Sequence, residues 1–195
     1  MTADPALPRP FIAVGFAVLT ISDTRVKADD VSGDTLARRI EQAGHRLVAR
    51  AIVKDEVRAI RAMVRKLTAR RDVQAVITTG GTGLTGRDVT IEAVQPLFDK
   101  EMDGFSAMFH QVSFGKIGMT TMQSRVTAGL INCTYVFCLP GSPGACKDGW
   151  DEILVKQFDN RTMPSNFVDI MPRLDEHRRR AAGQARRASG RRTTS

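Results

Sequence analysis

Continuous apolar runs alternate with amphipathic patterns along this chain. Four runs rich in aliphatic and β-branched residues predict buried strands, at Phe11–Ser22, Leu47–Val53, Val73–Thr79 and Thr134–Leu139. Between and after these runs, apolar residues recur every three or four positions, which predicts helices that bury one face. Because strands and helices alternate, we expect an α/β fold of three layers, with a mostly parallel sheet and helices on both faces.

Local signals place the boundaries of the predicted helices. The first is expected to begin near Ser32-Gly33-Asp34 and to end at Gly44, and the second to open at Asp55-Glu56. Thr90 is expected to cap a third helix. A fourth helix, over Phe105–Ser113, has an apolar stripe that we expect to face the core, formed by Phe105, Met108, Phe109 and Val112.

The chain is predicted to form one folded domain with an extension at each end. Its 195 residues are 42% hydrophobic and 26% charged, which is typical of a globular protein. We expect residues 1–10 to be an N-terminal extension, residues 11–176 to be the domain and residues 177–195 to be a disordered basic tail. The tail contains seven arginines and no acidic residue, so the net charge of +8 falls to +1 once it is set aside.

This charge distribution bears on possible partners. The tail could contact an acidic partner or nucleic acid weakly, or it could be a solvated extension without a specific function. The nearly neutral domain has neither an aromatic stacking motif nor a helix-turn-helix signature. We therefore expect no specific nucleic-acid binding.

The cysteines and the first apolar run indicate the compartment. Cys133, Cys138 and Cys146 are odd in number and lack the spacing of zinc ligands, so we expect reduced thiols. The run Phe11–Ile21 is too short to span a bilayer, and only one basic residue precedes it. We therefore expect a cytoplasmic protein without membrane attachment.

A glycine-rich segment, Thr78–Thr90, follows the third predicted strand and precedes a helix. Its four glycines let the backbone approach a ligand and turn N–H groups toward an anion, while threonine hydroxyls and Arg87 add donors. The segment favours phosphate binding, although a tight strand-to-helix connection would use the same residues. It matches neither the P-loop nor the dinucleotide-binding pattern, which argues against those common nucleotide sites.

Acidic residues follow three separate strands. Asp23, Asp55 and Asp88 come after the first, second and third strands, and ligands bind at the carboxyl edge of such sheets. Carboxylates that meet there can hold Mg²⁺ against substrate phosphates, or accept hydrogen bonds from an amine-bearing ring. Each of them could instead be an ordinary charge in the first turn of a helix.

Two further polar segments are expected at the same edge. Ser124-Arg125 combines a hydroxyl with a guanidinium, which suits a terminal phosphate. Pro140-Gly141-Ser142-Pro143 ends the last predicted strand in a rigid turn, with the Ser142 hydroxyl available as a donor. Turn geometry alone would also explain the second segment.

Taken in order, these segments resemble the MoaB/MogA family of molybdenum-cofactor biosynthesis proteins over most of Ala13–Leu174, and MoaB more than MogA. The family fold is the three-layer α/β fold expected above. The resemblance also rests on Val53-Lys54-Asp55-Glu56, which contains the site residue Asp55, and on three further motifs, which are Ser32-Gly33-Asp34, Ala145-Cys146 and Pro164-Ser165-Asn166-Phe167.

The resemblance implies a function and a set of site residues. It implies binding of molybdopterin and, in active members, transfer of AMP from ATP with Mg²⁺ to its terminal phosphate. Asp55 and Asp88 match the acidic positions assigned to catalysis and to pterin or Mg²⁺ handling. The substrate-binding positions are Ser22, Asp23, Thr79, Gly80, Gly81, Thr82, Gly83, Arg87, Ser124, Arg125, Pro140, Gly141 and Ser142.

The resemblance further implies a homotrimer or homohexamer. An alternative within the same pathway is a non-catalytic molybdopterin-binding or scaffold protein, because the turn at Pro140–Pro143 is of the MoaB type. The intact Asp55, Asp88 and Arg87-Asp88-Val89-Thr90 run favours an active adenylyltransferase. A different nucleotide enzyme on the same fold stays open, since a fold does not determine a function.

Overall fold

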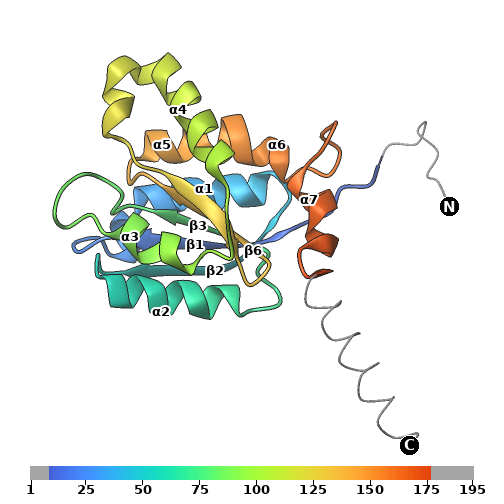
Figure 1. The fold of residues 1–195 in the computed structure, drawn as a ribbon, viewed down its shortest axis with the longest axis horizontal. Helices are drawn as coiled ribbons and strands as arrows, with labels where there is room; N and C mark the ends of the chain where they lie inside the picture. The colour runs from blue at the N-terminus through green and yellow to red at the C-terminus, as the bar shows by residue number, and fades with distance from the viewer. Residues whose placement is uncertain (1–8, 177–195) are drawn as a thin grey trace, which may run out of the picture.

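A computed structural model describes residues 9–176 of the chain, and the predicted basic tail 177–195 lies outside them. Within these residues a six-stranded sheet has the order β2-β1-β3-β6-β5-β4 (Figure 1). Its strands are β1 Gly15–Ile21, β2 Arg46–Val53, β3 Ala75–Thr79, β4 Lys100–Glu101, β5 Thr127–Ile131 and β6 Thr134–Leu139. Strands β2, β1, β3 and β6 are parallel, and β5 is antiparallel to both of its neighbours.

Helices cover both faces of the sheet (Figure 1). The α-helices are α1 Val31–Gln42, α2 Val57–Thr68, α3 Thr90–Val94, α4 Asp103–Ile117, α5 Pro143–Asp148, α6 Val155–Gln157 and α7 Phe167–Ile170. A π-helical turn, Gly149–Leu154, joins α5 to α6. Shorter 3₁₀ turns are η1 Lys27–Asp29, η2 Gln95–Leu97, η3 Gly118–Gln123 and η5 Met171–Arg173.

Strand β1 shows why the sheet needs cover on both faces. All of its residues are buried, and successive side chains point to opposite faces. Phe16 and Val18 enter a core cluster with residues of α1, α4 and the π-helical turn, whereas Ala17 and Leu19 enter a second cluster with α2 and α3. The predicted three-layer α/β arrangement is confirmed.

Some predicted boundaries were wrong. The first strand begins at Gly15 and not at Phe11, because the backbone N–H groups of Ile12 and Val14 donate to the side chains of Asn160 and His45. The third helix stops at Val94, and its cap position is Val89. The Thr90 hydroxyl donates instead to the carbonyl of Gly80, at 2.9 Å.

Helix α4 also departs from the predicted pattern. Phe105 and Phe109 are buried as expected, but Met108 is exposed. It belongs to a set of exposed apolar side chains on α4 and η3, which also contains Phe114, Ile117, Met119 and Met122. We call these five side chains the α4–η3 patch.

The three cysteines, predicted to be reduced thiols, form no disulfide in the structure. Cys133, Cys138 and Cys146 are free, and the last two are buried. Burial raises the pKa of Cys138 to about 12 and that of Cys146 to about 11. Both buried thiols therefore stay protonated near neutral pH. Separately, none of the helices within residues 9–176 has the length and apolarity needed to cross a membrane.

His45 is buried against the aromatic core, and its Nδ1 accepts a hydrogen bond from the Val14 N–H at 3.2 Å. Its ring lies about 5 Å from the rings of Phe11 and Phe16. This burial lowers the pKa of His45 to about 4, and the charge of Asp159 opposes the shift. The imidazole is therefore neutral in the folded protein at neutral pH.

We expect stability to fall as the pH drops from about 6.5 to about 4. The unfolded chain takes up a proton on His45 in this window and the folded chain does not, so up to roughly 3 kcal/mol of unfolding free energy is lost. The measurement is urea denaturation at several pH values. His45→Asn keeps an acceptor for Val14 but does not titrate; if its stability falls as steeply as that of the unmodified chain, His45 is not the cause.

Candidate functional site

The loops at the carboxyl ends of β1, β3 and β6 meet because glycines leave room between them. A Cβ atom on Gly80 would overlap the carbonyl oxygen of Ile21, and one on Gly141 would lie 3.1 Å from the Gly80 Cα. Gly80 also has φ of +103°, a conformation that suits glycine. The N–H of Gly80 donates to the Leu139 carbonyl at 3.1 Å, so the ends of β3 and β6 are joined.

Three predicted acidic residues come together at this edge. The N–H of Asp55 donates to Asp23 Oδ1 at 3.2 Å, and the N–H of Val89, next to Asp88, donates to Asp55 Oδ1 at 3.3 Å. A Cβ atom on Gly81 would lie 2.5 Å from Asp55 Oδ2, so the glycine backbone packs directly on this carboxylate. The glycine-rich loop and the end of β2 thus form one acidic cluster.

The three carboxylates differ electrostatically. Burial, together with the charges of Asp88 and Asp23, raises the pKa of Asp55, although the Val89 N–H opposes this. The hydrogen bond from Arg87 lowers the pKa of Asp23, and the hydrogen bond from the Thr85 hydroxyl lowers that of Asp88. The charged form of Asp55 is therefore the least favoured of the three, and a bound cation would stabilise it most.

Two arginines hold the glycine-rich loop from opposite sides. Arg87 forms an ion pair with Asp23 at 2.6 Å, which ties the tip of the loop to the end of β1. Arg125 donates from Nε to the Thr82 carbonyl at 2.9 Å and pairs with Glu92 at 2.5 Å. Because its donors are used in this way, Arg125 anchors the loop on the side of β5.

The turn after β6 completes the edge. The hydroxyl of Thr79 donates to the Pro140 carbonyl at 2.9 Å, and the Ser142 hydroxyl accepts from the Ala145 N–H as the cap of α5. The Gly141 carbonyl accepts hydrogen bonds from Ser32 and Arg25, at 2.8 and 3.2 Å. The turn is therefore fixed to the loop after β1 through Arg25, to the start of α1 through Ser32, and to the end of β3 through Thr79.

The predicted residues differ in exposure: Thr79, Gly80 and Thr82 are buried, whereas Asp23 and Arg87 are exposed. Ser22 accepts hydrogen bonds from the N–H groups of Thr24 and Arg25, and it leads directly into Asp23. Ser124 is half-buried, and its carbonyl lies 3.0 Å from Nε2 of His110. Sequence reasoning gave no role to Arg25, Arg50 or Glu92, although each lies close to a residue that it had selected.

Mg²⁺ would need oxygen ligands beyond those of the protein at this site. No group of three or more His, Cys, Asp or Glu side chains within residues 9–176 is arranged to hold a metal ion. Mg²⁺ commonly uses one or two carboxylates and shares substrate phosphates and water. The pair Asp55 and Asp88 fits that mode of binding, since Asp55 is close to like charges and partly withdrawn from water.

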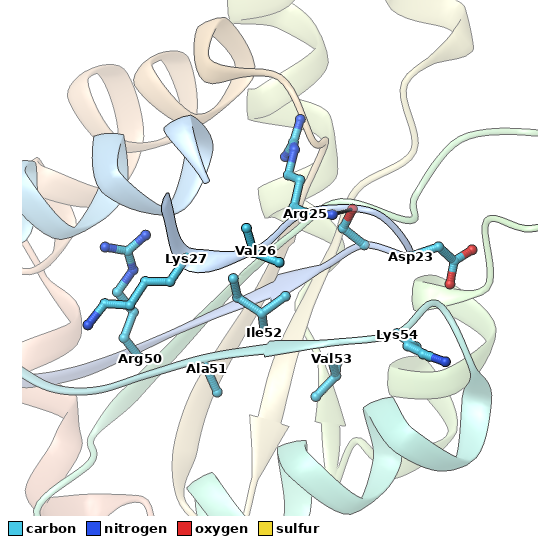
Figure 2. Close-up of a pocket in the computed structure, with 10 residues that line it drawn as sticks. Asp23, Arg25, Val26, Lys27, Arg50, Ala51, Ile52, Val53 and Lys54 are labelled. Carbon is cyan, nitrogen blue, oxygen red and sulfur yellow. Dashed lines mark hydrogen bonds between the residues drawn. The ribbon is translucent and has the colours of Figure 1, made fainter. Parts of the chain in front are cut away.

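A cavity of about 510 Å³ adjoins the cluster on the side of β2 (Figure 2). It lies between the loop after β1 and the strand β2, and shares Ser22 and Asp23 with the predicted site. Its other lining residues are Arg25, Val26, Lys27, Arg50, Ala51, Ile52, Val53 and Lys54.

Gly81→Ala should disrupt the site, whereas Gly86→Ala should not. Gly81 has φ of +62°, and the added methyl group would meet both Asp55 and Thr90 at 2.5 Å. We expect a loss of roughly 1–3 kcal/mol in unfolding free energy and movement of Asp55. Gly86 lies in the same loop with nothing within 4 Å of its Cβ position, so its variant should stay within about 0.5 kcal/mol. Urea denaturation measures both; equal stabilities would contradict the close packing on Asp55.

Comparison with known proteins places the chain in a family. A model described as "Probable molybdopterin binding domain" matches residues 17–160. Molybdenum cofactor biosynthesis protein B of Escherichia coli (strain K12) is 48% identical over 157 residues, covering 80% of this chain and 92% of that protein.

Solved structures show the same similarity. A crystal structure of molybdenum cofactor biosynthesis protein B matches with a TM-score of 0.77 and 36% identity, over 87% of this chain and 99% of that one. The tungsten cofactor synthesizing protein MoaB from Pyrococcus furiosus matches with a TM-score of 0.64 and 37% identity, over 72% and 90%.

Proposed function

This chain belongs to the molybdopterin-binding family of molybdenum-cofactor biosynthesis proteins, and from that premise we propose that it transfers AMP from ATP to molybdopterin. The observation that carries the proposal is the meeting of Asp23, Asp55 and Asp88 with the glycine-rich loop. A phosphate-transfer site needs anion donors close to carboxylates that can share a cation with the substrate. This edge of the sheet offers both.

The molybdopterin phosphate is assigned to the glycine-rich loop. Gly80 and Gly81 have positive φ, a conformation typical of loops that turn N–H groups toward an anion, and the Thr82 and Ser124 hydroxyls are candidate donors. Arg125 positions this loop through the Thr82 carbonyl, and its charge is paired with Glu92. The turn Pro140–Ser142 packs against Gly80 and borders the same space.

The carboxylates are assigned to the reacting phosphates. When bound, Mg²⁺ would be held by Asp55 and Asp88 and would neutralise the charge of the nucleotide. An oxygen of the molybdopterin phosphate attacks the α-phosphorus of ATP, the bond to the β-phosphate breaks, and pyrophosphate leaves. The chain needs no covalent nucleophile for this step, because it acts by aligning the two phosphates and balancing their charge.

A non-catalytic molybdopterin-binding or scaffold protein is the alternative. One feature favours it: Asp88 Oδ2 accepts hydrogen bonds from both the N–H and the hydroxyl of Thr85, at 3.0 and 2.6 Å. A carboxylate used in this way can serve the shape of the loop without taking part in a reaction. Turnover separates the two functions.

Asp88→Asn should lower the rate of adenylyl transfer at least about 100-fold, a loss of roughly 2.7 kcal/mol of transition-state stabilisation. The amide can still accept from the Thr85 N–H, so the loop should keep its shape while the charge is lost. The assay mixes protein, molybdopterin, ATP and Mg²⁺ and follows pyrophosphate release.

Thr85→Ala is the matched control, because it removes a hydrogen bond to Asp88 but leaves the charge. It should retain most of the activity. An equal loss in both variants would assign Asp88 to loop structure, and molybdopterin binding without turnover by the unmodified chain would establish the non-catalytic alternative.

We further propose that the chain assembles as a homotrimer or homohexamer through the α4–η3 patch. Its exposed Phe114, Met119 and Met122 are more than half accessible, and apolar side chains gathered in this way are typical of interfaces. Phe114→Glu should shift the sedimentation coefficient toward that of a monomer. Val31→Glu changes an equally exposed apolar residue outside the patch and should leave the assembly intact. A monomeric unmodified chain would refute the proposal.

A further inference from the structure

Ser124 is held by its backbone, whereas its hydroxyl is left for a ligand. Its N–H donates to the Thr121 carbonyl at 3.0 Å, and its carbonyl lies 3.0 Å from Nε2 of His110. The hydroxyl forms no hydrogen bond with any other group of residues 9–176. Because both backbone groups of Ser124 are engaged, few directions are open to its side chain.

The contact between His110 and Ser124 requires a proton on Nε2, because a carbonyl oxygen only accepts hydrogen bonds. The other ring nitrogen, Nδ1, lies 2.7 Å from the Ser106 carbonyl and 3.4 Å from the Ser106 hydroxyl. Nδ1 can donate to the carbonyl when it carries a proton, or accept from the hydroxyl when it does not. Both of these partners belong to Ser106, so the ring keeps Nε2 toward Ser124 in either case.

Helix α4 gives the imidazole a firm support. Phe105 and Phe109 are buried and fix this part of α4 on the core. The ring of Phe109 also lies edge to face with that of His110, with 6.1 Å between their centres. His110 is half-buried, so its hydrogen bond to Ser124 is partly shielded from water. A donor held by packing in this way can fix the segment that it contacts.

We infer that His110 is a positioning residue for the molybdopterin phosphate, acting through the hydrogen bond from its Nε2–H to the Ser124 carbonyl. The inference rests on the proposed function, in which the Ser124 hydroxyl is a donor to that phosphate. A hydroxyl that is already oriented loses little conformational freedom when it binds. Arg125, the next residue, donates to the Thr82 carbonyl, so a shift of Ser124 would also disturb the contact with the glycine-rich loop.

The test uses two amide side chains that differ in reach. The glutamine amide nitrogen can take the place of histidine Nε2, whereas the asparagine amide nitrogen, one methylene closer to the backbone, corresponds to Nδ1. In calorimetric titration with molybdopterin, His110→Gln should stay within about threefold of the unmodified chain, and His110→Asn should bind at least about tenfold more weakly. Gln111→Asn, at the next and exposed position of α4, is the control and should stay within about twofold.

Two further titrations separate positioning from a general structural role. His110→Asn should bind ATP with Mg²⁺ as the unmodified chain does. In a Ser124→Ala background, His110→Asn should weaken molybdopterin binding less than about twofold, because it acts through the Ser124 hydroxyl. Equal losses in the two amide variants, a parallel loss of ATP binding, or an undiminished effect in the Ser124→Ala background would each overturn the inference.

The same titrations distinguish this inference from the adenylyl transfer. If the unmodified chain binds molybdopterin without releasing pyrophosphate, the transfer fails, and the difference between His110→Gln and His110→Asn still supports the positioning role. If pyrophosphate is released and His110→Asn binds molybdopterin normally, the transfer stands and the role of His110 is wrong. If the unmodified chain binds no molybdopterin, both fail.

Discussion

The whole site depends on backbones that approach more closely than side chains would allow. Gly80 packs against the end of β1, Gly141 packs against Gly80, and Gly81 packs against the carboxylate of Asp55. Because no Cβ atoms separate them, the ends of three parallel strands and the first residues of their loops share one small volume. The acidic cluster exists at this edge because the glycines bring Asp55 and the loop that carries Asp88 together.

The close approach also brings negatively charged carboxylates together, and nearby arginines neutralise part of this charge. Three carboxylates share the edge, and burial with like charges raises the pKa of Asp55. Arg87 neutralises Asp23, and Arg125 pairs with Glu92 just beyond the cluster. Among residues 9–176, Asp55 and Asp88 are thus left without an ion pair, and Asp88 instead accepts hydrogen bonds from Thr85. The same neutralising pairs also hold the loop in place, so the charge balance and the shape of the site have a common origin.

The sequence predicted the architecture well because buried parallel strands have a strong apolar signal, as in Thr134–Leu139. It missed β5, whose residues Thr127–Ile131 form a mixed polar and apolar segment that becomes a strand only by pairing with β6. The acidic residues and the glycine-rich loop could be predicted from the sequence, because short segments that follow predicted strands identify them. The sequence could not identify Arg50 or Glu92, because their roles depend on partners distant in the chain. The cytoplasmic location and the lack of nucleic-acid binding stay predictions.

Strand β2 forms one edge of the sheet within residues 9–176, and this has a consequence for the behaviour of the protein in solution. Unpaired strand edges can recruit strands of other molecules and start aggregation. Arg46, Arg50 and Lys54 recur at every fourth position along this edge, so two copies that approached edge to edge in parallel would bring like charges together. The charge of Arg50 is neutralised by Asp30 and Asp34. Most of the repulsion would therefore come from Arg46 and Lys54, near the two ends of the strand. Since dissolved salt screens such repulsion, concentrated salt weakens this protection against misassembly.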